Sequence, residues 1–410
     1  MIALWLASVA HASCLVATGG DVWTGTEDKT RAAFVVMQDG VIEQVADLGT
    51  AVPTDCVGVG SETAWVTPGL VAVPTQLGVN EVSLEHRTVD ASENTEDPVR
   101  AALRVIDAYN PRSSLVPVTR VGGVTSAVVA PTGGLIAGQA GWVDLAGGSQ
   151  DAAVKQPTVA MVAEAATSGS RAAGLLRLRE AITEARWYAD NGGAWATGRA
   201  RDPAVEPLDL EALGQVASGE VPLLVAANRA SDIEALVRVV EELDVRLVIT
   251  GAAEGWLVAD ALAAADVAVV IDPLVYGAGS FDQIHGRPDN GKLLAEAGVD
   301  VIVSSFQTHN ARSLRTVAGN AVRGGMAYLD ALAAVTAVPA RVFGMDDHGT
   351  LEAGKAANLV VWSGDPLEIS SRVEAVVIGG EVVPVTTRQT ELRDRYSDLP
   401  GTPLPPAGTL

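Results

Sequence analysis

Histidine is scarce in this chain of 410 residues. The sequence has five: His11, His86, His285, His309 and His348. Neutral imidazole is the commonest protein ligand for zinc and similar ions. A metal centre that needs several histidines therefore has few residues to draw on.

Positive charge is also in short supply. There are 28 Lys and Arg against 50 Asp and Glu, which gives a formal net charge of −22. A surface of this sign repels nucleic-acid phosphates and anionic lipid headgroups. The sequence also lacks a run of about 18 uninterrupted apolar residues, which a membrane-spanning helix needs. We expect neither a nucleic-acid partner nor a transmembrane segment.

The first residues form an apolar run that ends in Ala10-His11-Ala12, the small-x-small pattern of a signal-peptidase site, although no Lys or Arg precedes the run. We predict a signal peptide over residues 1–12 and export to the periplasm or the extracellular space. The alternative is a cytoplasmic protein whose first strand lies here. In an exported protein Cys14 and Cys56 are able to form a disulfide, whereas in a cytoplasmic one they are buried thiols.

The two ends of the chain differ in pattern from its middle. Short strand-like runs separated by turn residues occupy residues 14–17, 33–37, 41–45 and 57–59, and similar runs return after residue 358. Between them, apolar strands alternate with helical stretches, as in a parallel sheet covered by helices. About eight such units over roughly 270 residues favour a closed barrel over an open sheet.

We therefore predict an α/β fold, a TIM-like (β/α)8 barrel with a small β-sandwich domain built from both chain ends. Residues 66–349 are assigned to the barrel, and residues 13–65 and 350–390 to the sandwich. Two of the barrel strands are expected between residues 135 and 162. Residues 391–410, with four prolines, are predicted to be a Pro-rich tail.

Two motifs flank the middle of the chain. The first is Val66-Thr67-Pro68-Gly69-Leu70-Val71, and the second is AVPARVFG at 337–344, continued by GTLEAGKAANLVVW at 349–362. They resemble the V-x-P-G-L-I-D and N-P-A-x-x-L-G … G-S-I-x-x-G-K-x-A-D-L-V-V motifs of the amidohydrolase superfamily. Within it, Asn110-Pro111-Arg112 and the stretch 133–139 are similar to the imidazolonepropionase-like branch.

The resemblance implies hydrolysis of non-peptide C–N bonds by a divalent metal, normally zinc, held at the carboxyl ends of barrel strands. The positions at which the family places its ligands hold Pro74, Gln76, Ala226, Asn228, Thr250 and Phe306. Pro, Ala and Phe side chains have no ligand atom, and neutral amide or hydroxyl oxygens are poor zinc ligands. We therefore expect no metal cofactor and a non-catalytic homologue that binds a small molecule or a partner. The alternative is an active hydrolase of cyclic amides or related C–N bonds with a relocated metal or a metal-free acid–base site.

The remaining candidate site residues lie mainly on loops expected at the barrel mouth. His86, His285 and His309, with Asp282, would form a relocated metal site if they converged, but solvated loop histidines are the simpler interpretation. Arg112 and Arg229 are candidates for holding an anionic ligand, and Gln139 for shaping the pocket. The carboxylates considered for metal-free acid–base chemistry are Asp90, Glu93, Glu96, Glu254 and Asp272. Association with a second copy or with an active paralogue remains open.

Overall fold

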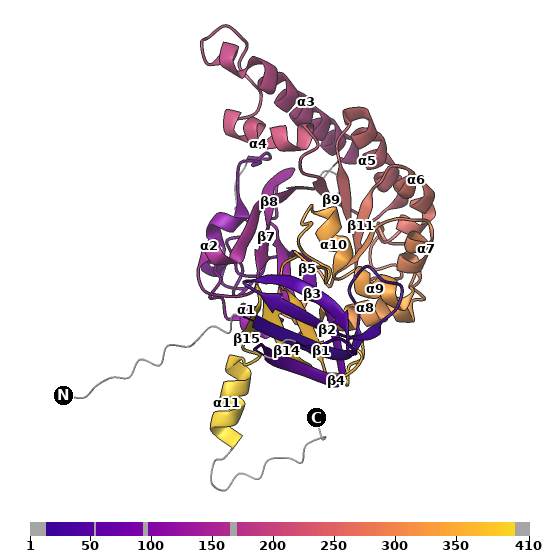
Figure 1. Cartoon of the computed structure of the whole chain (residues 1–410). Helices are drawn as coiled ribbons and strands as arrows, with labels where there is room; N and C mark the ends of the chain where they lie inside the picture. Colours follow the sequence, from indigo (N-terminus) through magenta and orange to yellow (C-terminus); the bar gives the residue numbers. More distant parts are fainter. Residues whose placement is uncertain (1–13, 53–54, 93–96, 165–169, 398–410) are drawn as a thin grey trace, which may run out of the picture.

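The computed structural model describes residues 14–52, 55–92, 97–164 and 170–397. Two sheets organise this part of the chain, one with seven strands and one with eight (Figure 1). The predicted signal peptide and the candidates Glu93 and Glu96 lie outside the described residues. No helix in the described part of the chain is both long enough and apolar enough to span a membrane.

The seven-stranded sheet combines both ends of the chain, as predicted. Its order is β15-β14-β13-β4-β1-β2-β3. The strands are β1 (Cys14–Val22), β2 (Arg31–Gln38), β3 (Val41–Asp47), β4 (Val57–Pro68), β13 (Leu359–Trp362), β14 (Val373–Ile378) and β15 (Glu381–Val383). β4 joins the two halves because it pairs in parallel with β1 and antiparallel with β13. A disulfide links Cys14 to Cys56, with their Cα atoms 4.6 Å apart.

The eight-stranded sheet is a nearly closed barrel, which confirms the predicted fold class. In sequential order its strands are β5 (Leu70–Thr75), β6 (Val124–Val129), β7 (Ile136–Asp144), β8 (Val154–Ala163), β9 (Leu223–Ala227), β10 (Leu247–Gly251), β11 (Ala268–Ile271) and β12 (Val301–Val303). Residues 334 and 335 span the seam between the first and the last strand. Val71 N donates to Val335 O at 2.8 Å, and Val303 N donates to Ala334 O at 3.0 Å.

One part of the barrel departs from the predicted alternation of strands and helices. β7 runs antiparallel to both β6 and β8, so these three strands form a meander. Only the four-residue helix α2 (Gln150–Ala153) lies between β7 and β8. The prediction of eight parallel strand–helix units was wrong here, because strands buried on both faces have similar apolar sequences whichever way they run. The sequence 136–144, for example, is buried along its whole length.

Helices cover the parallel part of the barrel (Figure 1). α5 shows the usual reason, since Ile233, Leu236, Val237 and Val240 recur at helical spacing and are all buried. The longer helices are α3 (Arg171–Trp195), α4 (Pro207–Ala217), α5 (Ala230–Leu243), α8 (Leu314–Arg323) and α11 (Arg388–Ser397). The shorter ones are α1 (Leu115–Arg120), α6 (Ala259–Ala264), α7 (Asn290–Glu296), α9 (Tyr328–Ala333) and α10 (Ala337–Val342).

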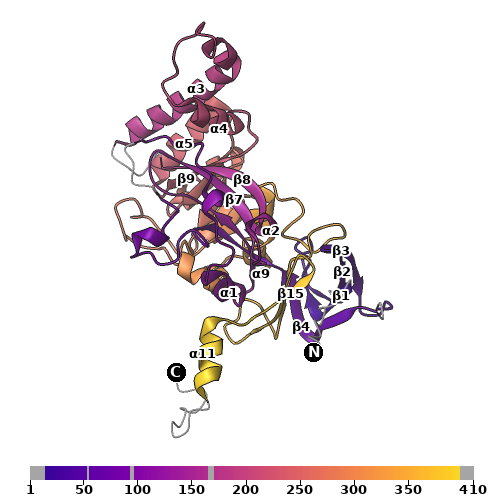
Figure 2. The ribbon, with the colours of Figure 1, turned by 90° about the vertical axis from the view of Figure 1, so that its left-hand side faces the viewer.

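Two helices project from the body of the molecule. The far end of α3 extends beyond the barrel together with α4 (Figure 1). α11 projects from the other end (Figure 2) and buries none of its residues. Residues 391–397 of this helix belong to the segment predicted to be a Pro-rich tail, and the prolines of that segment lie outside the described residues.

The barrel interior is packed at one end by α10 and the residues that follow it. Inward-facing strand residues such as Val73, Val128 and Val270 form one cluster with Ala340 and Phe343. This cluster fills much of that end with apolar side chains, and the cavity described below opens toward the carboxyl ends of β5 and β9.

Candidate functional site at the barrel mouth

A cavity of about 300 Å³ opens at the carboxyl ends of the barrel strands. Parallel strands bring these ends to one edge, which is where barrel enzymes place their active sites. Its lining consists of Pro74, Thr75, Gln76, Ala130, Pro131, Thr132, Val162, Ala163, Glu164, Leu224, Ala226, Thr250, Phe306 and Thr308. The described chain thus offers a preformed hollow where the family resemblance places chemistry.

Five of the six positions singled out from the sequence meet in this cavity. They are Pro74, Gln76, Ala226, Thr250 and Phe306. The sixth, Asn228, is not in the lining, and its Oδ1 accepts a hydrogen bond from Ala253 N at 3.3 Å. The strand ends therefore bring together residues that are up to 232 positions apart, measured from Pro74 to Phe306.

Gln76 is held by a small polar network. Its backbone N–H donates to Thr308 Oγ1 at 3.1 Å, and its Oε1 accepts from Asn80 Nδ2 at 2.9 Å. Its Nε2 lies 3.4 Å from Thr132 Oγ1. The amide group of Gln76 is therefore already engaged by neighbouring residues of the mouth.

Phe306 carries an unusual backbone conformation, with φ at +50°. A bulky residue in the left-handed region is strained, and such strain persists only when the surroundings enforce it. Ser304 Oγ accepts the Phe306 N–H at 3.0 Å, and Ser305 Oγ accepts the Gln307 N–H at 3.3 Å. This turn after β12 places an aromatic ring, 39% exposed, at the edge of the cavity.

Glu164 is a carboxylate residue of the cavity lining and is not among the candidates predicted from the sequence. It follows directly on β8, and its Oε1 lies 3.3 Å from Gly133 N. Its own N–H donates to Leu135 O at 2.9 Å. The available signal was a charged residue at the end of the apolar run 159–163. It was missed because the boundaries of the two strands in that region were not resolved from the sequence.

Comparisons with known proteins point to one family. The model of the Amidohydrolase family matches residues 258–384. Amidohydrolase tasK from Hapsidospora irregularis is 25% identical across 88% of this chain, and this chain spans 42% of that protein's length. The crystal structure of an amidohydrolase from Thermotoga maritima MSB8 aligns with a TM-score of 0.81 at 24% identity, covering 90% of this chain and 99% of that one. The chain is thus similar to amidohydrolases over part of its sequence and in its fold.

A second solved structure shares the fold at lower sequence identity. The structure of A. niger ochratoxinase aligns with a TM-score of 0.54 at 14% identity over 91% of this chain and 96% of that one. At this identity the likeness concerns the fold alone. The family match is consistent with the imidazolonepropionase-like branch expected from the sequence.

The three loop histidines do not form a cluster. His86, His285 and His309 are all exposed. His309 Nε2 lies 3.0 Å from Glu81 O, and the backbone N–H of His285 donates to Glu254 Oε1 at 3.0 Å. Across the ranges that the structure describes, no three His, Cys, Asp or Glu side chains gather closely enough to hold a metal ion. The convergence that a relocated metal site requires is therefore not found there.

The candidate carboxylates have structural contacts outside the cavity. Glu254 is 3% exposed, and its two oxygens accept from Ala230 N and His285 N, both at 3.0 Å. Asp272 accepts from Leu274 N at 2.9 Å, and burial raises the pKa of its carboxyl group. Asp90 is exposed. None of the three lines the mouth cavity, so they do not form the acid–base pair considered from the sequence.

The remaining polar candidates are also placed elsewhere. Arg229 donates to Asp232 Oδ1 at 2.7 Å, and Arg112 is exposed. Gln139 is 5% exposed and donates to Ala101 O at 2.9 Å, while its own oxygen accepts from Thr158. None of these residues lines the cavity. Gln139 on β7 therefore links the loop at Ala101 to Thr158 on the neighbouring strand β8.

Proposed function

We propose that this amidohydrolase-superfamily protein is a non-catalytic homologue whose barrel mouth binds a small organic molecule in place of a metal ion. The observation that carries the proposal is the lining of the mouth cavity. Five positions that the family resemblance assigns to metal ligands meet there as Pro74, Gln76, Ala226, Thr250 and Phe306.

These side chains do not fit a catalytic divalent ion. Such an ion needs about three His or carboxylate ligands held rigidly around it. Pro, Ala and Phe contribute no donor atom, and Gln76 and Thr250 contribute neutral oxygens only. The amide oxygen of Gln76 is also engaged by Asn80. Among the described lining residues Glu164 alone adds a carboxylate, so this donor set stays below what metal-assisted hydrolysis requires.

The chemistry of the lining indicates the class of ligand. The cavity lies at the small end of the range for ligand pockets and is walled largely by Pro, Ala, Val, Leu and Phe side chains. Thr132, Thr250 and Thr308 add hydroxyl groups. No Lys, Arg or His of the described chain is part of this lining, which therefore offers an anionic ligand no positive charge. A compact, weakly polar molecule with hydrogen-bonding groups fits this lining best.

Metal content tests the proposal directly. We expect protein that has been incubated with Zn²⁺ and then dialysed to hold well below one equivalent of zinc by elemental analysis. The matched control is the variant Gln76→His/Ala226→His/Phe306→Asp, which restores ligand atoms at three strand ends and is expected to retain more zinc. One equivalent of zinc in the unmodified protein, lost in the Glu164→Gln variant, would contradict the proposal.

A second candidate function is supported by the position of Glu164. A carboxylate in a largely apolar mouth is suited to general acid–base catalysis. The protein would then hydrolyse cyclic amides or related C–N bonds without a metal. Turnover of such compounds by the unmodified protein in the presence of a chelator, abolished by Glu164→Gln and unaffected by Glu254→Gln, would favour this function over the first.

We also propose that the protein is exported and that it associates with a second copy or with an active paralogue. The pairing of Cys14 with Cys56 supports export, because disulfides persist in oxidising compartments. Intact mass with and without reductant tests the disulfide, and light scattering after gel filtration tests the association. A reduced, strictly monomeric protein from its native source that co-purifies with no paralogue would contradict both ideas.

A further inference from the structure

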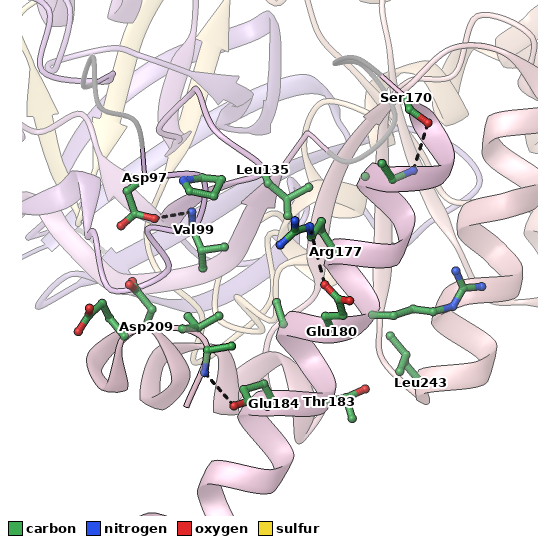
Figure 3. Close-up of a pocket in the computed structure, with 18 of the residues that line it drawn as sticks. Asp97, Val99, Leu135, Ser170, Arg177, Glu180, Thr183, Glu184, Asp209 and Leu243 are labelled. Atoms are coloured by element: carbon green, nitrogen blue, oxygen red, sulfur yellow. Dashed lines mark hydrogen bonds and ion pairs between the residues drawn. The ribbon is translucent and has the colours of Figure 1, made fainter. Parts of the chain in front are cut away.

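A second and larger hollow lies along α3. Its volume is about 1050 Å³, and it shares no lining residue with the mouth cavity. One wall is α3, with Arg177, Glu180 and Glu184, and the opposite wall carries Asp97, Val99 and Asp209 (Figure 3). We call this hollow the α3 groove.

Among the described residues that line the α3 groove, carboxylates outnumber cations by six to two. Three of the six have basic partners close by. Glu242 pairs with Arg179 at 2.8 Å, Glu184 with Arg201 at 2.7 Å, and Glu180 with Arg177 at 3.8 Å. The negative charge of Glu206 and Asp209, at the start of α4, has no such basic partner among the described residues.

Asp209 is the key residue of this groove. Its side chain lines the groove although the residue is only 7% exposed. Oδ1 accepts the Ala102 N–H at 2.7 Å, and Oδ2 accepts no hydrogen bond from the described chain. Burial, together with the charges of Asp97 and Glu206, raises the pKa of this carboxyl group. A nearly buried carboxylate without a cation is costly, so a cation supplied from outside would be strongly favoured there.

An apolar surface continues from this acidic end of the groove. Val99, Leu135, Ala173 and Val205 all line the same hollow. A ligand that satisfies both parts carries a positive charge on a flexible hydrocarbon chain. We propose that the α3 groove binds an aliphatic polyamine, with one ammonium group at Asp209 and Glu206 and the methylene chain against the apolar residues.

The chemistry favours an alkylammonium ion over a metal ion. An ammonium group needs only hydrogen-bond acceptors at about 2.8 Å, whereas a metal needs several converging ligands. No such group of three metal ligands occurs in the described chain. The overall charge of −22 also raises the local concentration of cations around the protein.

Calorimetric titration of the full chain with spermidine at about 0.15 M NaCl, where distant charges are screened, tests the proposal. We expect saturable binding at one site, weakened at least about tenfold by Asp209→Asn. This change removes the charge and keeps an acceptor for the Ala102 N–H. Glu206→Gln, at an exposed position, should weaken binding several-fold and serves if Asp209→Asn fails to fold.

The matched control is Asp260→Asn, which removes the same charge from an exposed position on α6 outside the groove. Its spermidine affinity should equal that of the unmodified protein. The proposal is wrong if Asp209→Asn and Glu206→Gln bind spermidine as tightly as the unmodified protein. It is also wrong if Asp260→Asn weakens binding as much as they do, because spermidine would then be attracted by the net charge of the protein and not by the groove. Because no residue of the mouth cavity takes part, this outcome leaves the proposed function unaffected.

Discussion

The two ends of the barrel interior differ in the ionisable side chains that they contain. At the mouth, Pro74, Ala226 and Phe306 stand where the family resemblance expects charged or imidazole ligands. At the other end, Asp144 and His348 are buried, 1% and 5% exposed, and bonded to each other. One end therefore holds a bonded pair of ionisable side chains, whereas the mouth holds the carboxylate of Glu164 among largely apolar residues.

We call the end of the barrel that contains Asp144 and His348 its floor. The buried hydrogen-bond network there connects the barrel with the segment of chain that returns to the seven-stranded sheet. His348 Nε2 lies 3.3 Å from Asp144, and its Nδ1 lies 2.7 Å from Asp347. Ser126 Oγ donates to Asp144 Oδ1 at 2.7 Å, and Asn358 Nδ2 lies 3.4 Å from that hydroxyl. A buried charge held by several hydrogen bonds is strongly destabilising when one partner is removed.

The largest expected effect is therefore at the floor. Asp144→Ala leaves His348 with one fewer acceptor and removes the carboxylate to which the Ser126 hydroxyl donates, and should lower the free energy of unfolding by about 3–5 kcal/mol. Urea titration followed by circular dichroism measures it. If the free energy of unfolding fell by less than about 1 kcal/mol, the Asp144 network would not be what stabilises the floor of the barrel.

The next effect is a dependence of stability on pH. Burial opposes the charged form of His348, but bonds and charges from Asp144 and Asp347 outweigh it and raise the pKa of the imidazole. Burial would raise the pKa of Asp144, but His348, Ser126 and Asn358 outweigh it and lower that pKa. A tenfold difference in proton affinity between the folded and unfolded states corresponds to about 1.4 kcal/mol of stability.

The sign of this dependence follows from linkage. The contribution of His348 is complete below its unfolded pKa of about 6.5 and is lost as pH rises through the raised value. The contribution of Asp144 is present above about pH 3.9 and is lost as pH falls through the lowered value. Unfolding free energies measured above pH 6.5 should fall in the unmodified protein and fall less in His348→Gln. Parallel curves for the two proteins would show that this pair does not govern the dependence.

At the mouth we expect a smaller change in stability, in the stabilising direction. Phe306→Gly relieves the positive φ of +50° and should leave stability unchanged or raise it by up to about 1 kcal/mol. Thermal unfolding provides the measurement. The matched control is Leu224→Gly, which removes a buried residue of β9 at the same cavity and should destabilise. Clear destabilisation by Phe306→Gly would mean that the ring contributes packing that outweighs the strain.

The smallest effect is expected for Thr250→Ala. The Thr250 hydroxyl faces the mouth cavity and makes no side-chain hydrogen bond within the described chain. The free energy of unfolding should change by no more than about 0.5 kcal/mol. A loss of several kcal/mol in chemical denaturation would place a structural role at the mouth and weaken the comparison with the floor.

The sequence was sufficient to predict the barrel and the shared sheet, because the motifs at 66–71 and 349–362 flank strands whose apolar runs are unambiguous. The direction of β7 was not predictable, since Ile136–Asp144 is buried on both faces and no periodicity distinguishes a parallel from an antiparallel strand. The role of Gln139 was also hidden. Its partners, Ala101 and Thr158, are 38 and 19 residues away in sequence.

Some residues of the mouth cavity could be predicted from the sequence. Residues at the ends of β5, β9, β10 and β12 could be placed because each follows a clear apolar run. Glu164 could not, because it depends on the register of the meander. The α3 groove depends on contacts between α3, α4 and the segment at 97–99, and its key bond joins residues 102 and 209, which are 107 positions apart.

The position of β4 has a consequence for synthesis. This strand pairs on one side with β1, which is made early, and on the other with β13, which begins only at Leu359. While a ribosome translates the intervening 290 residues from Gly69 to Asn358, one edge of β4 has no native neighbour. Unpaired edges invite the wrong strand, so the nascent chain is most exposed to mispairing during the time that its barrel is being made.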